Sequence, residues 1–114
     1  MFIHDAASAR EWAADWIKYA TARRSWGRTL RMLQDTIEAQ RTCARSCRSR
    51  GQDAAAESHE AAVAELGLHV QHAQAAADAE AATQAAALRA AEAEREAMWA
   101  RLAQKRAQGG SPRA

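Results

Sequence analysis

The chain has 114 residues, of which 33 are alanine, with one proline, five glycines and four tryptophans. Its 16 basic and 14 acidic side chains nearly balance, at a net charge of +2. This composition favours helix over nearly the whole length and offers no credible strand, so the predicted class is all-α. The N-terminal stretch carries His4, Asp5, Arg10 and Glu11 where a signal peptide or membrane span would need apolar residues. We therefore expect a cytoplasmic protein that does not contact membranes.

The first predicted helix covers residues 5–50. Ser8 followed by Glu11 is typical of a capping box, and Asp5 is a competing N-cap. From there the chain keeps an unbroken 4-3 spacing, and a repeat averaging 3.5 residues places its members on one seam that faces another helix. The seam positions are Trp12, Trp16, Tyr19, Arg23, Trp26, Leu30, Leu33, Ile37, Gln40, Ala44 and Cys47.

A turn at residues 51–53 separates this helix from a second one, predicted over 53–108. Gly51 suits the left-handed position after a helix, and Asp53 is a good N-cap for the next one. Residues 109–114, which include Gly109 and Pro112, are predicted to be a flexible tail. Because the connection is short, the two helices should be antiparallel neighbours that form a single hairpin domain over residues 1–108.

Folding the chain about Gly51 predicts the register of this coiled-coil-like hairpin. Leu33 would lie opposite Val70, and Trp16 opposite Leu88. The aromatic residues of the first helix would then face the most alanine-dense stretch of the second, which suits close packing. The second helix also has an alternative 11-residue repeat, formed by Leu66, Ala77, Leu88 and Trp99. This repeat would make the helix straighter than a heptad coil.

A single seam leaves much of each large ring open to water. Two hairpins that pair into a four-helix bundle would cover these rings, so we expect a homo-oligomer, and another protein partner is the alternative occupant of the same surface. The predicted interface consists of Trp12, Trp16, Tyr19, Trp26, Leu30, Leu33 and Ile37.

One group of residues has metal-binding chemistry. Cys43 and Cys47 are four residues apart on one helical face, and the hairpin register places His59 across from them. Two thiolates and an imidazole are a plausible Zn set, although the spacing matches no zinc motif. The simpler interpretation, which we favour, is that both cysteines pack as small apolar residues in a reducing compartment and that the protein has no cofactor.

Charge is distributed unevenly along the chain. Residues 1–50 hold ten basic and five acidic side chains, whereas residues 51–114 hold six and nine. Opposite signs favour an antiparallel pair of helices, so Arg41, Arg45, Arg48 and Arg50 are interpreted mainly as charges that set helix orientation. A nucleic-acid-binding face on the first helix is the alternative, and it is not favoured.

No catalytic motif stands in the sequence. It lacks a Gly-rich phosphate loop, a nucleophile next to a base, and the Glu-x-x-His pair of di-iron bundles. We therefore expect a non-enzymatic helical-hairpin interaction protein, such as an adaptor, chaperone, inhibitor or structural component of a bacterial or phage assembly.

Overall fold

The computed structural model describes residues 2–109, and every regular element in that range is helical. The helices are α1 (Ala6–Arg23), α2 (Trp26–Ser49) and α3 (Asp53–Gly109). The chain divides into two compact units, residues 1–80 and residues 81–114. The first unit holds α1, α2 and the first half of α3, and the described part of the second unit is residues 81–109 of α3. The all-α prediction is therefore confirmed for the described residues; residues 110–114 of the predicted tail lie outside them.

Helix α1 begins with a capping box, but not the one expected. Asp5 is the N-cap, and its Oδ1 accepts a 2.8 Å hydrogen bond from the backbone N–H of Ser8. The Ser8 Oγ in turn accepts a 3.1 Å hydrogen bond from the backbone N–H of Asp5. The box therefore uses Asp5 and Ser8 rather than Ser8 and Glu11, because a serine three residues after the cap can return the bond as a glutamate would.

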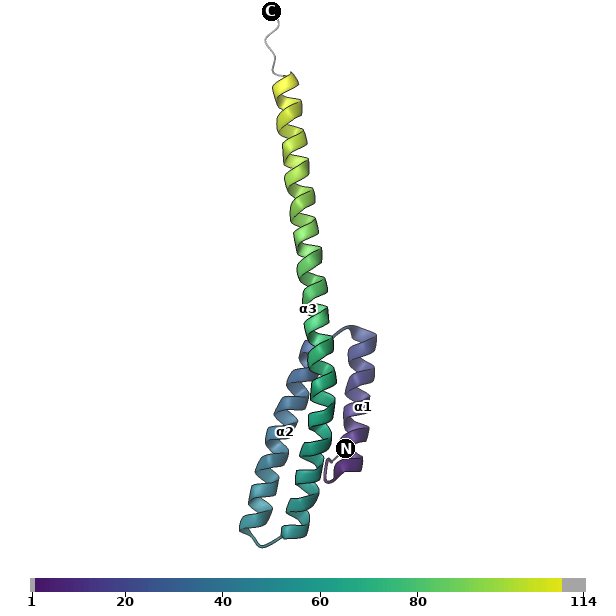
Figure 1. Cartoon of the computed structure of the whole chain (residues 1–114), viewed down its shortest axis with the longest axis vertical. Coiled ribbons are helices and arrows are strands. Elements are labelled where there is room, and N and C mark those ends of the chain that lie inside the picture. Colours follow the sequence, from purple (N-terminus) through teal and green to yellow (C-terminus); the bar gives the residue numbers. More distant parts are fainter. Residues whose placement is uncertain (1, 110–114) are drawn as a thin grey trace, which may run out of the picture. The chain divides into compact units, whose positions relative to one another are not determined.

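The helix expected over residues 5–50 is instead two helices. Arg24 adopts a left-handed conformation with φ 53° and ψ 46°, and its backbone N–H bonds to the carbonyl of Ala20. Ser25 then starts α2 without a side-chain capping bond. The chain reverses here, and α1 lies alongside α2 (Figure 1). The prediction of one continuous helix was wrong because packing of α1 onto the rest of the first unit outweighs the cost of a non-glycine left-handed residue.

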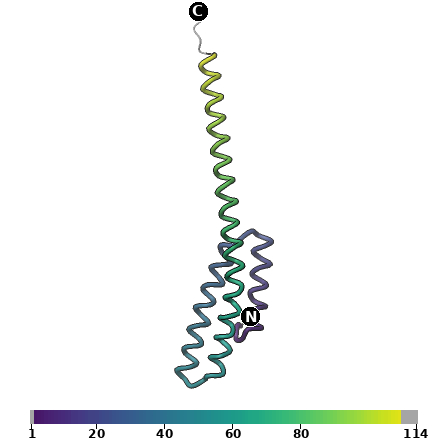
Figure 2. The backbone as a smooth tube through the Cα atoms, viewed as in Figure 1, coloured from purple at the N-terminus to yellow at the C-terminus, as the bar shows by residue number. Residues whose placement is uncertain are grey.

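The turn between α2 and α3 lies where it was expected, although Asp53 is the first residue of α3 rather than its N-cap. Gly51 has φ +72°, and its N–H donates to the carbonyl of Arg48 at 3.0 Å. The next N–H, from Gln52, bonds to the carbonyl of Cys47 at 2.8 Å, and α3 begins at Asp53. The tube view shows α2 and the start of α3 running back along each other from this turn (Figure 2).

The core of the first unit is small and built largely from alanine. Leu33 of α2 and Leu66 of α3 are fully buried. Fully buried alanines surround them and let the helix backbones approach closely; these are Ala9, Ala13, Ala62 and Ala73. Ile3, Trp12, Trp26, Leu30, Ile37 and Val70 pack against this cluster and are partly buried.

Ion pairs and ring contacts join the three helices of this unit. Arg10 of α1 donates to Glu65 of α3 at 2.9 Å. Five residues earlier on α3, Glu60 accepts two hydrogen bonds from Arg48 of α2, at 2.7 and 2.9 Å. The Trp26 ring meets the His72 ring edge-on, with centroids 5.4 Å apart. Each contact fixes one helix against another within residues 2–80.

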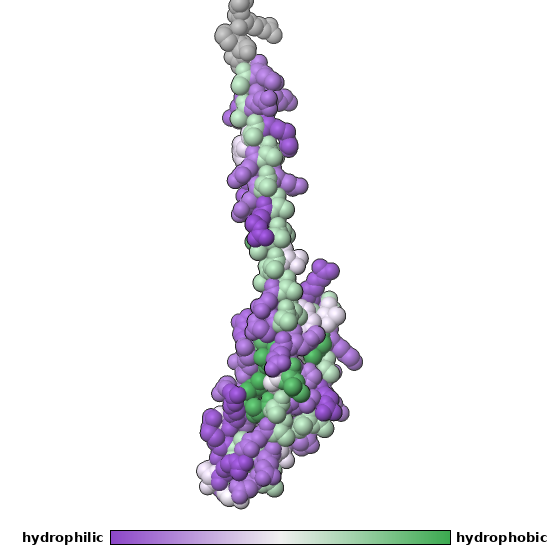
Figure 3. Space-filling view, in the orientation of Figure 1, coloured by the Kyte–Doolittle hydropathy of each residue, from purple (hydrophilic) through white to green (hydrophobic). Residues whose placement is uncertain are grey.

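The described part of the second unit is one helical segment in which every residue except Ala85 is exposed. Every residue from 86 to 109 is exposed. Four of them are large and apolar: Leu88 (66% exposed), Met98 (45%), Trp99 (57%) and Leu102 (40%). The hydropathy surface shows pale alanine between charged side chains on this segment (Figure 3). None of the described helices is both long enough and apolar enough to cross a membrane.

Candidate functional site

Most of the residues expected at an intermolecular interface pack inside the first unit. Leu33 is fully buried, and Trp26, Leu30 and Ile37 pack against the core around it. Trp12 joins them from α1. Because α1 folds back onto α2 and α3, it gives these side chains the cover that a second hairpin was expected to provide. Leu88, which was expected opposite Trp16, is 66% exposed.

Trp16 and Tyr19 are also partly buried, but they are not among the residues that pack against this core cluster. Their rings meet edge-on at 5.4 Å, and Trp12 lies 6.1 Å from Trp16. The Arg28 guanidinium lies over the Tyr19 ring, 6.0 Å from its centre. This cation–π contact covers part of the ring face. With Asp15 these rings line a shallow apolar depression. The aromatic side chains of α1 thus contact one another and leave only this small surface open.

The predicted zinc ligands are not brought together. Cys43 is exposed and Cys47 is buried, so they face different surroundings. The Nδ1 of His59 lies 2.7 Å from Oε1 of Gln40, which occupies that nitrogen. Among residues 2–109 no three His, Cys, Asp or Glu side chains converge as a metal site would require. The hairpin register predicts which residues lie opposite each other on two helices, but it does not predict whether their side chains meet at one point.

Gln40, a polar residue on the predicted seam, has a structural role. Its side chain is 7% exposed, and its Nε2 donates a 3.2 Å hydrogen bond to the carbonyl of Ile3. Its other end faces His59. The amide therefore joins the N-terminal segment, α2 and α3, and a buried polar group with both ends bonded favours one register over others.

The arginines near the end of α2 are largely engaged with neighbouring side chains. Arg41 pairs with Glu38, and Arg45 donates to the Thr42 hydroxyl at 3.3 Å. The hydrogen bonds and charge of Glu60 raise the pKa of Arg48, and the same bonds hold the pKa of Glu60 below its usual value. Of these contacts, only that of Arg48 with Glu60 joins two helices, whereas those of Arg41 and Arg45 lie within α2.

The surface that the sequence reasoning missed lies on α3 beyond residue 80. Its members are the exposed apolar residues Leu88, Met98, Trp99 and Leu102, which we call the distal face. The signal was present as the 11-residue spacing of Leu66, Ala77, Leu88 and Trp99, because eleven residues are close to three helical turns. The hairpin register assigned this stretch to the aromatic residues of α1, so its exposure was not foreseen.

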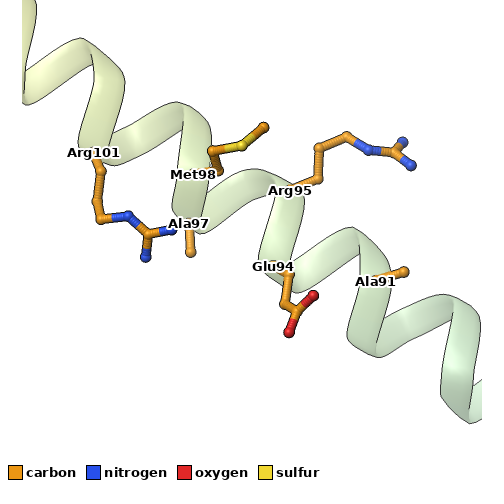
Figure 4. A pocket seen from close by; sticks show the side chains of 6 residues that line it. All are labelled: Ala91, Glu94, Arg95, Ala97, Met98 and Arg101. Atoms are coloured by element: carbon orange, nitrogen blue, oxygen red, sulfur yellow. The ribbon is translucent and has the colours of Figure 1, made fainter.

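Charged residues are interleaved with the distal face. Near its middle stand Arg89, Glu92, Arg95 and Glu96, all exposed. A close view shows Arg95 and Met98 leaving the helix on one side and Glu94 on the other (Figure 4). The hollow between these side chains is formed by a single helix, with residues of no second element lining it. It is therefore a dent on a helix surface rather than a cavity for a small molecule.

The described residues define an all-α protein with a three-helix unit and a separate exposed helical segment. Comparison of the chain with protein-family models, with curated proteins and with solved structures finds no match.

Proposed function

We propose that this chain is a non-enzymatic helical interaction protein, an adaptor, chaperone, inhibitor or structural component of a larger assembly, and that the distal face binds its protein partner. The observation that carries the proposal is the full exposure of residues 86–109, including Trp99 at 57% and Leu88 at 66%.

Physical chemistry supports a partner for this segment. A lone helix in water is held by propensity alone, since helical stability in proteins comes mainly from packing an apolar face. Large aromatic and aliphatic side chains gain about 25 cal/mol for each Å² of apolar surface that leaves water. An exposed apolar face bordered by charged residues is typical of a protein-binding surface. The three-helix unit, whose own apolar residues are already packed, would carry and position this segment.

The proposal is tested by removing the distal face without touching the first unit. W99A/L102A should abolish association of the full chain, either with itself or with proteins captured from cells, while thermal unfolding of the three-helix unit stays unchanged. The matched control is A93S/A100S, which changes two residues on the opposite side of the same helix and should keep association.

Two results would contradict the proposal. One is association that survives W99A/L102A. The other is association that is lost instead in W16A/Y19A, which would place the binding surface on the exposed rings of α1.

A further inference from the structure

This inference rests on the proposed function and names the partner of the distal face. On a helix with 3.6 residues per turn, Leu88, Trp99 and Leu102 fall within about 60° of one another. Glu92 and Arg95 fall on the same strip between them. A partner must therefore cover large apolar groups at both ends of the strip and two opposite charges at its middle.

A second copy of the same segment meets these requirements when it runs antiparallel. If the twofold axis lies between Ala93 and Glu94, Leu88 of each copy faces Trp99 of the other. Leu102 then faces Ala85, so a large side chain meets a small one, as close packing requires. Because a twofold interface repeats every contact, each of these pairs occurs twice.

The charges fit the same register. Glu92 of each copy faces Arg95 of the other, which gives two ion pairs at the centre of the strip. Arg89 and Glu96 lie on one side of the strip, at about 100° and 80° from Leu88, and an antiparallel pair brings the same sides together. Opposite charges that meet across helices set partner choice and orientation.

A parallel pair in register lacks this complementarity. It would place Glu92 on Glu92 and Arg95 on Arg95, and like charges that face each other are destabilising. The exposed charges of the segment therefore discriminate between the two orientations, as well as between a second copy and an unrelated apolar helix.

We propose that residues 81–106 of α3 form an antiparallel two-helix dimer with a second copy of this chain, centred between Ala93 and Glu94. The dimer buries Leu88, Trp99 and Leu102 of both copies and pairs Glu92 with Arg95.

Charge reversal in the full chain tests the register. In sedimentation equilibrium, E92R alone should raise the dimer Kd at least about tenfold, because two ion pairs become two Arg–Arg contacts. R95E alone should do the same, through two Glu–Glu contacts. An equimolar mixture of the two variants should form heterodimers with a Kd within about threefold of wild type. Restoration by mixing excludes an effect inside one helix, since each chain still carries its own reversal.

The matched control is E94R, which makes the same charge change as E92R on the side of the helix away from the strip (Figure 4). Its dimer Kd should stay within about threefold of wild type. Unchanged circular dichroism and thermal unfolding of every variant would show that the three-helix unit is intact.

Several outcomes would overturn the dimer. The wild type could be monomeric at roughly 100 µM. E92R and R95E could each leave the dimer Kd unchanged, or their equimolar mixture could fail to form heterodimers. A monomeric wild type that still captures another protein through Trp99 and Leu102 would leave the proposed function standing and remove only the second copy as partner. If the distal face supports neither self-association nor binding of another protein, both the proposed function and the proposed dimer are wrong.

Discussion

One helix, α3, has two different environments along its length. Between residues 56 and 73 it buries Leu66 and several alanines against α1 and α2. Between residues 86 and 109 it is richer still in alanine and carries comparable large apolar residues, yet every residue is exposed. The sequence pattern is similar in both regions, so pattern alone does not set exposure: the first region packs against α1 and α2 within its own unit, and the side chains of the second region are exposed.

The first of these regions also shows what α1 contributes to the core. Once α1 folds back at Arg24, its buried alanines and Trp12 complete the three-helix unit. The aromatic residues that were expected to require a second hairpin are then mostly covered. The large apolar residues that stay exposed, and for which we propose a partner, are then on the later part of α3.

The largest expected effect contrasts two leucines of α3. L66A removes a fully buried side chain and should lower the free energy of unfolding by about 2–5 kcal/mol. L88A removes a side chain that is 66% exposed and should change it by less than about 0.5 kcal/mol in a dilute monomer. Urea unfolding of both variants measures the difference. Equal losses would mean that the two regions of α3 are packed alike.

A smaller change in the free energy of unfolding tests the break between α1 and α2. Its sign should be opposite to that of most glycine substitutions. Arg24 is left-handed with φ 53°, so R24G should raise the free energy of unfolding by about 1 kcal/mol. In one continuous helix the same change would lower it by about 1 kcal/mol. The neighbouring variant R23G, inside α1, should be destabilising and serves as the control. A decrease in stability for R24G would instead favour one continuous helix over residues 5–50.

The smallest effect concerns the tie between α1 and α3. The hydrogen bond from Arg10, with a further contact from His69, lowers the pKa of Glu65 in the folded chain. A carboxyl group with a lowered folded pKa contributes stability at neutral pH, and this contribution is lost as the pH falls through that pKa. R10A should therefore be less stable than wild type near neutral pH, and the difference should shrink in acid.

Urea unfolding at several pH values measures this difference. K105A makes the same charge change within residues 81–109 and should show no comparable dependence. A deficit of R10A that stays constant into acid would show that the Arg10–Glu65 pair does not join the helices.

The sequence was sufficient for some parts of this fold for clear reasons. Alanine content and the lack of strand-forming residues predicted the all-α class, and Gly51 marked a turn that requires positive φ. The break at Arg24 and Ser25 was missed because no glycine, proline or asparagine stands there and the 4-3 spacing runs through it. The reversal is favoured by the packing of α1 side chains such as Ala9, Ala13 and Trp12, and that packing depends on residues far along the chain.

The candidate sites illustrate the same limit. Leu33 is buried and Trp26 packs against the core, but spacing does not tell whether such residues pack within a chain or between chains. Cys43, Cys47 and His59 were placed at facing positions, yet side-chain directions and the contact of His59 with Gln40 keep them from forming one ligand set. The distal face was recognisable as a repeat, and its exposure required knowledge of where α1 goes.

Hydrogen–deuterium exchange along α3, followed at several protein concentrations, tests the difference between its two regions most directly. We predict strong protection of the amides near Leu66 and Ala73 at every concentration, because they belong to the core of the first unit. Amides from residue 86 to 106 should exchange rapidly in dilute protein and become protected as the concentration rises and the distal face is covered. Equal protection along the whole of α3 that does not depend on concentration would contradict the account.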